Sequence, residues 1–217
     1  MTMSDSKGQV VDDPEPRWHA LVAVCAVAGL SVALPPYLIV GPRWLFIGLV
    51  VVLLIPTVIS HRTGHHRINK FFGFVVVSIL TLAMIFSLAL LIKALPSHKE
   101  SPFDLLISAV SLWSTNILVF ALWYWKIDAG GPHGRDQISG HSEGAFLFPQ
   151  MTMDDDYVKD WSPNFIDYLF LAFNTSTAFS PTDAPILARW AKLLMMVQAS
   201  ISLTVIALLA GRVVNIL

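Results

Sequence analysis

A cluster of hydroxyl side chains and one carboxylate follows a short apolar run in the C-terminal third of the chain. Its members are Thr175, Ser176, Thr177, Ser180, Thr182 and Asp183. Hydroxyl and backbone carbonyl oxygens can replace the water around a cation where a channel narrows. Irregular backbone at membrane depth survives only where it is buried in protein or lines water. The cluster is therefore a candidate ion pathway. The alternative is a structural turn, because Ser-Pro-Thr-Asp suits a turn in which the aspartate accepts hydrogen bonds from the nearby backbone.

The last apolar run of the chain also carries polar residues. Gln198 and Ser202 are four residues apart, so they share one face of a helix. We regard both as further candidates for the ion pathway. The alternative is that they make packing contacts, since small hydroxyl residues are common where membrane helices meet.

Histidines are the other residues that could bind an ion. His61 and His65 would lie on one helical face, with His66 next to them, and such a pattern can hold a divalent metal. Gly64 disfavours the helix that this site needs. A basic segment that contacts anionic lipid headgroups explains the same residues. We therefore predict no metal site and no cofactor, and keep the three histidines only as weak metal candidates.

The composition indicates a membrane protein that is not an enzyme. Of the 217 residues, 55% are hydrophobic and only 13% are charged, whereas about 25% are charged in soluble domains. The net charge of -1 gives no reason to expect nucleic-acid binding. No nucleophile, carboxylate pair or phosphate-binding loop stands in a supporting pattern. No internal repeat is present, so a pore built from one such motif needs several copies of the chain around an axis.

The apolar runs predict an all-α membrane fold of about five spans. The predicted spans cover residues 18–40, 44–60, 71–95, 105–125 and 190–216 of a single membrane domain, 17–217, after a polar, disordered tail, 1–16. The second span is short because Pro56 and the polar residues after it are expected to end it. A glycine-rich loop, 126–162, precedes a pore-like helix and turn, 163–183.

The pore-like helix is too short to cross a bilayer. Ser162 and Pro163 predict its start as an N-cap followed by proline at the first helical position. About 14 residues fit a re-entrant segment that enters the membrane and leaves on the same side. The alternative is an amphipathic helix that lies on the membrane surface.

The arrangement of short helix, turn and long helix resembles the pore module of the potassium-channel superfamily. The signature T-x-T-T-V-G-Y-G-D aligns without gaps on residues 175–183, and only Thr175, Thr177 and Asp183 match it. Ser180 and Thr182 replace the two glycines, whose backbone freedom lets successive carbonyls face the axis. The resemblance implies a homo-oligomer, a tetramer if the likeness holds, with weak potassium selectivity at best.

A second resemblance covers more of the chain, from about residue 116 to the C-terminus. It consists of NILVFALWYWKIDAGG, then GAFLFPQ, then DYLFLAFNTSTAFSPTDA, and a basic residue pair before an aliphatic helix. This order is similar to that of a bacterial five-span membrane family of unknown function. It implies a multi-pass protein of the bacterial inner membrane and brings no established activity.

The basic residues predict the orientation. With a cytoplasmic N-terminus and five crossings, only Arg43, Lys93, Lys99 and Arg212 of the 14 Lys and Arg residues lie outside. The positive-inside rule therefore places the N-terminus in the cytoplasm. The pore-like hairpin then opens to the cytoplasm, opposite to the filter of a potassium channel.

These observations predict a channel-like homo-oligomer that passes monovalent cations with weak selectivity. The lipid bilayer, monovalent cations and further copies of the chain are the expected partners. The alternative is a non-conducting membrane scaffold or sensor in which the hairpin is only structural. Metal transport through the three histidines is a third hypothesis.

Overall fold

The computed structural model describes residues 18–39, 41–62, 66–94, 101–135, 144–153, 161–177 and 184–214, and over these residues the chain forms helices and no strand. The long elements are α1 (Trp18–Ala33), α2 (Arg43–Arg62), α3 (His66–Ala94), α4 (Pro102–Ile127), α6 (Phe165–Thr177) and α7 (Arg189–Val214). The short ones are η1 (Pro36–Leu38), η3 (Asp128–Gly130), α5 (Pro132–Arg135) and η4 (Pro149–Thr152). The predicted tail, 1–16, lies outside the described residues.

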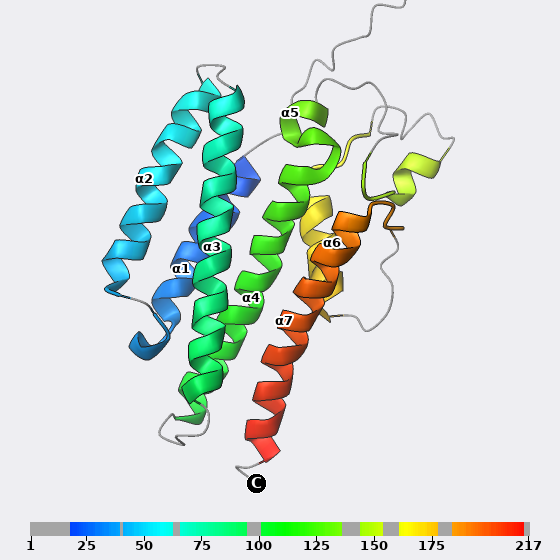
Figure 1. The fold of residues 1–217 in the computed structure, drawn as a ribbon. Coiled ribbons are helices and arrows are strands. Elements are labelled where there is room, and N and C mark those ends of the chain that lie inside the picture. The colour runs from blue at the N-terminus through cyan, green and yellow to red at the C-terminus, as the bar shows by residue number, and fades with distance from the viewer. Residues whose placement is uncertain are drawn as a thin grey trace, which may run out of the picture.

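Helix α4 is the centre of the bundle. It packs against α1, α3, α6 and α7, whereas α2 lies on the outer side of α3. Figure 1 shows the long helices side by side, with α6 covering only the upper part of α4 and α7. The two helices with predicted pathway residues, α6 and α7, therefore both contact α4.

Three helices are long and apolar enough to cross a membrane. They are Arg67–Ala94 in α3, Pro102–Arg135 through α4, and Arg189–Gly211 in α7, while α1 and α2 contain shorter apolar helices. The chain is therefore a membrane protein. The buried share of these spans differs widely, from 67% in α4 to 17% in α7. Most of the surface of α7 is thus left for lipid or for another chain.

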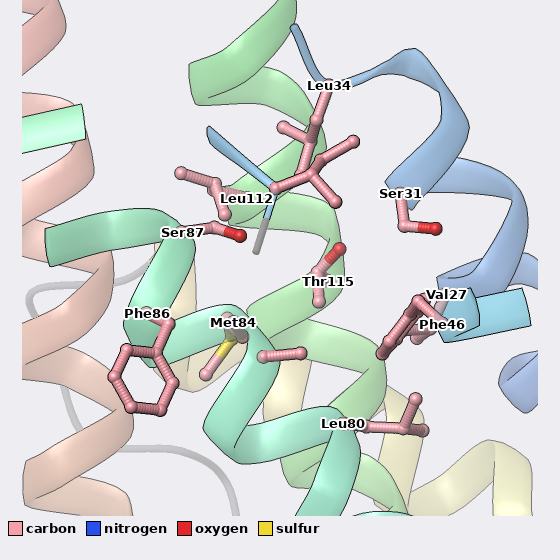
Figure 2. A pocket seen from close by; sticks show the side chains of 12 residues that line it. Val27, Ser31, Leu34, Phe46, Leu80, Met84, Phe86, Ser87, Leu112 and Thr115 are labelled. Carbon is pink, nitrogen blue, oxygen red and sulfur yellow. The ribbon is translucent and has the colours of Figure 1, made fainter. Parts of the chain in front are cut away.

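The first helix is shorter than the predicted span 18–40. It ends at Ala33, because Pro35 and Pro36 cannot continue the helical hydrogen bonds, and a single turn, η1, follows. The Ser87 hydroxyl of α3 donates to the carbonyl of Leu38 at 2.8 Å and holds this turn against the bundle. A cavity of about 100 Å³ lies beside it, with side chains of α1, α3 and α4 around it (Figure 2).

Helix α2 continues through Pro56 to Arg62, so the expectation that this proline helps to end the helix is wrong. Proline removes one backbone donor from the helix. In membrane helices, nearby Ser and Thr hydroxyls can compensate for such a disturbance. Here the hydroxyl of Thr57 donates to the carbonyl of Leu53 at 2.9 Å, one residue after the Val52 carbonyl that loses its helical donor at Pro56.

Helix α6 begins at Phe165, two residues after the predicted start. Asn164, not Ser162, makes the cap: its side-chain oxygen accepts from the N–H of Ile166 at 2.8 Å. In return, Asp167 accepts from the N–H of Asn164 at 2.8 Å. This reciprocal pair satisfies two donors that a helix start leaves open, which fixes the first residue of α6.

Candidate functional site

A buried polar network joins α4, α6 and α7 within one chain. Its members are Asn116 and Tyr124 of α4, Ala172 and Ser176 of α6, and Gln198 and Ser202 of α7. All six are buried, and Gln198 and Asn116 are 0% exposed. Polar groups at such positions are costly unless they are hydrogen bonded, so the contacts of each one decide what the network does.

Gln198 is the centre of this network. Its side-chain nitrogen donates to the carbonyl of Ala172 at 2.7 Å and to the hydroxyl of Ser176 at 2.8 Å. Its side-chain oxygen accepts from the hydroxyl of Tyr124. Both amide hydrogens and the carbonyl oxygen are thus used inside the protein, and one residue of α7 holds both α4 and α6.

Asn116 and Ser202 extend the network by another turn of α7. The side-chain nitrogen of Asn116 donates to the backbone carbonyl of Gln198 at 3.1 Å and to the Ser202 hydroxyl at 2.8 Å. Gln198 and Ser202 therefore share a face, as their spacing predicts, and that face meets α4. This placement favours the packing alternative for both residues.

The hydrogen bonds also show how far α6 extends along the bundle, measured from the end where α4 stops. Tyr168, in its first turn, contacts Asp128 just beyond α4, whereas Ser176, in its last turn, contacts Gln198. Gln198 lies about 14 Å along the axis from the start of α7 at 1.5 Å per residue. Helices α6 and α7 therefore start at one end of the bundle and run in the same direction.

The next described residues lie back at the end where α6 began. Ile186 forms an antiparallel bridge with Phe146, and the N–H of Leu187 donates to the carbonyl of Ala145 at 2.8 Å. The Trp190 ring of α7 contacts the Phe146 ring, with centroids 6.1 Å apart. The last turn of α6 and the residues from Ala184 onward thus lie at different levels along the bundle.

The remaining predicted pathway residues divide into two groups. Thr175 and Thr177 lie in the last turn of α6, where their hydroxyls donate to the carbonyls of Leu171 and Phe173 at 2.8 and 2.9 Å. A hydroxyl that donates in this way keeps oxygen lone pairs for another partner. Ser180, Thr182 and Asp183 lie outside the described residues.

The histidine candidates have no described side chains. His61 lies in the last turn of α2 and His66 begins α3, while His65 lies outside the described residues. In the part of the chain that the structure describes, no three His, Cys, Asp or Glu residues are grouped closely enough to hold a metal.

A second buried cluster closes the end of α4. Asp128 is 1% exposed, although the sequence places it in a loop. One of its carboxylate oxygens accepts from the Tyr168 hydroxyl at 2.6 Å, and the other accepts from the N–H of Ala145. A Cβ at Gly144 would lie 3.2 and 3.3 Å from these two oxygens, so glycine gives the carboxylate its room.

Arg135 lies on the other side of the same cluster and is also 1% exposed. Its guanidinium donates to the carbonyls of Trp125 and Asp128 at 2.9 and 3.0 Å and lies over the Tyr168 ring, 5.0 Å from its centroid. The last carbonyls of a helix have no partner within the helix. Arg135 therefore acts as the C-terminal cap of α4 and ties it to α6.

The turn between α4 and α5 depends on glycine. Ala129, Gly130 and Gly131 all have positive φ, and Gly131 has φ +88°. A Cβ at Gly131 would lie 2.7 Å from the carbonyl oxygen of Lys126, a backbone atom that cannot move away cheaply. This turn brings Arg135 back under the end of α4.

A small hollow, lined mostly by apolar side chains but with three polar ones, lies beside α6. It has a volume of about 120 Å³, and its lining includes Gln150, Asp167, Asn174 and Ala184. Burial raises the pKa of Asp167, and hydrogen bonds from the backbone N–H groups of Asn164 and of Asp167 itself oppose the rise. The hollow thus brings one carboxylate and two carboxamides close to Ala184.

Sequence reasoning missed Tyr124, Asp128, Arg135 and Tyr168 as members of these clusters. Tyr124 carried a usable signal, because it stands eight residues after the polar Asn116 on a predicted span. Asp128 and Arg135 carried none, since charged residues among glycines are usually solvated.

The structure thus presents two helices, α6 and α7, that run in the same direction and are fixed to α4 by one network inside the bundle and by another at its end. No family model matches the chain, and neither the curated proteins nor the solved structures contain a significant match. The arrangement of α6 and α7 and of the residues around them is therefore the feature of this chain from which a function can be inferred.

Proposed function

We propose that the chain is a channel-like protein of the bacterial inner membrane that forms a homo-oligomer, a tetramer in the simplest case, and passes monovalent cations with weak selectivity. In this proposal α1, α2, α3, α4 and α7 are five spans and the N-terminus is cytoplasmic. Helix α6 is re-entrant, and the turn after it narrows the path around the oligomer axis.

The single observation that carries the proposal is the depth of α6. It begins beside Asp128, reaches the level of Gln198, and is followed by residues that lie again at the starting end, beside Phe146. A short helix, a return and a long helix in this order are the parts of a pore module. In the proposal, residues 178–183 form the return, and irregular backbone at membrane depth must be buried in protein or line water.

The exposed side of α7 gives the proposed path its second wall. Leu193 and Met196 are each 64% exposed, and the hydroxyls of Ser200 and Thr204 bond only to carbonyls one turn earlier. The opposite side of α7 holds the network around Gln198. In an oligomer the exposed side is free to meet the axis, while Gln198 and Ser202 keep the hairpin rigid behind it.

The oxygen atoms near the hairpin fit hydrated monovalent cations. Thr175 and Thr177 offer hydroxyl lone pairs in the last turn of α6. Asp167, in the first turn, offers a carboxylate at the end of the bundle where the proposed path opens. Ser180 and Thr182 stand where a potassium filter has glycines. A closely spaced carbonyl ladder is therefore not expected, and selectivity between potassium and sodium should be weak.

Flux measurements on proteoliposomes test the proposal. Purified protein is expected to pass potassium, sodium and thallium faster than empty vesicles, and Asp183→Asn is expected to lower cation flux because it removes a carboxylate from the path. Absence of flux above empty vesicles, with no effect of Asp183→Asn, contradicts conduction.

Cysteine accessibility tests which side of α7 lines the path. In a Cys25→Ser background, which has no other cysteine, a charged methanethiosulfonate reagent should modify Ser200→Cys and reduce flux at least several-fold. Val52→Cys on α2 is the matched control, since Val52 is 62% exposed on a helix expected to face lipid. Equal modification of both positions, or of neither, would contradict a water path along α7.

A scaffold or sensor is the second candidate, and the buried network favours it. Gln198 and Ser202 make their hydrogen bonds within one chain, so the hairpin is stable without an axis. A monomeric protein that keeps its thermal stability and passes no cation would replace the channel proposal with this one.

A further inference from the structure

A cavity of about 230 Å³ opens where the first turns of α3 meet the end of α4 and the glycine turn after it. Its lining includes the cationic or titratable side chains of Arg67, Lys70, Lys126 and His133. None of the described residues that line it carries a carboxylate. The walls therefore concentrate positive charge in a space that can admit a small anionic group.

Lys126 is held in place by its surroundings. Its ammonium nitrogen lies 5.9 Å from the ring centroid of Phe74 and 5.5 Å from that of Trp125. Such contacts favour a cation that is partly withdrawn from water. A Cβ at Gly73 would lie only 2.1 Å from this nitrogen. The Lys126 side chain can therefore lie against α3 at this position because residue 73 is glycine.

The other walls are tied together by hydrogen bonds to the backbone. Lys70 donates to the carbonyl of Gly130 at 3.3 Å and thereby links α3 to the glycine turn. Asn69 donates to the carbonyl of Thr57 at 2.9 Å and links α3 to α2. The cavity thus lies between α3 and the end of α4 with the turn after it, and α3 is held both to that turn and to α2.

We propose that this cavity binds a phosphate group, as carried by an anionic phospholipid headgroup. It lies at the end of two helices that are long and apolar enough to cross a membrane, where headgroups are found. Basic pockets between membrane helices bind such headgroups, and the rings of Phe74 and Trp125 offer an apolar floor for the part of the lipid below the phosphate. This site does not depend on conduction, so it stands whether or not the channel proposal holds.

Native mass spectrometry of the full-length, delipidated protein tests the site. The probes are dioleoylphosphatidylglycerol and the zwitterionic dioleoylphosphatidylcholine. We expect phosphatidylglycerol to bind more tightly, and Lys70→Gln and Lys126→Gln to weaken its binding by about fivefold each. The matched control is Lys192→Gln, because Lys192 is an exposed lysine in the first turn of α7 at the same end of the bundle.

Gly73→Ala tests whether the position of the Lys126 ammonium in the cavity matters for lipid binding, separately from its charge. It keeps every cation but displaces the end of the flexible Lys126 side chain, so it should weaken phosphatidylglycerol binding by less than Lys126→Gln does. Lys70 is exposed, so Lys70→Gln keeps the test valid even if a substitution at Gly73 lowers stability.

Inorganic phosphate distinguishes the two sources of the group. If millimolar phosphate fails to displace phosphatidylglycerol, the headgroup is the ligand. If phosphate alone displaces it, and does so through Lys70 and Lys126, the same site serves a soluble phosphate compound. The proposal is overturned if phosphatidylcholine binds equally well, or if Lys192→Gln weakens binding as much as the two pocket variants.

Discussion

Replacing Gln198 with leucine is expected to lower the free energy of unfolding by about 2 to 4 kcal/mol. The change leaves the hydroxyls of Tyr124 and Ser176 without their partner in a buried place, and it removes the donor to Ala172. Each buried polar group without a partner costs about 1 to 3 kcal/mol. The thermal midpoint of the detergent-solubilised protein should fall by at least about 5 °C.

Ser200→Leu is the matched control for this variant. Ser200 lies on the same helix, is exposed, and bonds only to the carbonyl of Met196. Its replacement should change stability by less than about 0.5 kcal/mol. If the two variants have the same thermal midpoint, Gln198 does not hold α6 and α7 together.

Replacing Arg135 with alanine is expected to cost about 3 to 5 kcal/mol, because each hydrogen bond from a charged donor contributes about 1.5 to 3 kcal/mol. The carbonyls of Trp125 and Asp128 lose their donor, and the Tyr168 ring loses the guanidinium above it. Unfolding followed by tryptophan fluorescence in detergent measures the loss. The stability of Arg135→Lys should lie between that of the parent protein and that of Arg135→Ala. Lysine keeps the charge but lacks the several N–H donors of the planar guanidinium.

Arg189→Ala serves as the control for the arginine, because Arg189 is exposed at the same end of the bundle. It should stay close to the parent protein in stability. An Arg135→Ala protein as stable as Arg189→Ala would mean that the end of α4 needs no cap from the glycine-rich loop.

The positions of the helices were largely predictable, because apolar runs of membrane length leave few alternatives. The predicted spans 71–95, 105–125 and 190–216 overlap α3, α4 and α7 over almost their whole lengths. The errors arise where local chemistry overrides the pattern. Pro56 stays inside α2, and the start of α6 is decided by the reciprocal bonds of Asn164 and Asp167.

The buried clusters could be predicted only in part. The four-residue spacing of Gln198 and Ser202 predicts a shared face, but not that the face meets Asn116. Nothing in the sequence around Asp128 and Arg135 indicates burial, because their partners come from residues 125, 145 and 168, which only the fold brings near. Long-range contacts of this kind have no local pattern.

The mass of the purified complex, after the detergent contribution is subtracted, tests the central claim most directly. A channel-like path runs along a symmetry axis, and a single copy of α6 and α7 cannot surround such an axis. We predict a homo-oligomer, with four times the 23.9 kDa of one chain in the simplest case. A mass of 23.9 kDa in mild detergent and in lipid nanodiscs alike would contradict the channel proposal and leave the hairpin as a structural element of a single chain.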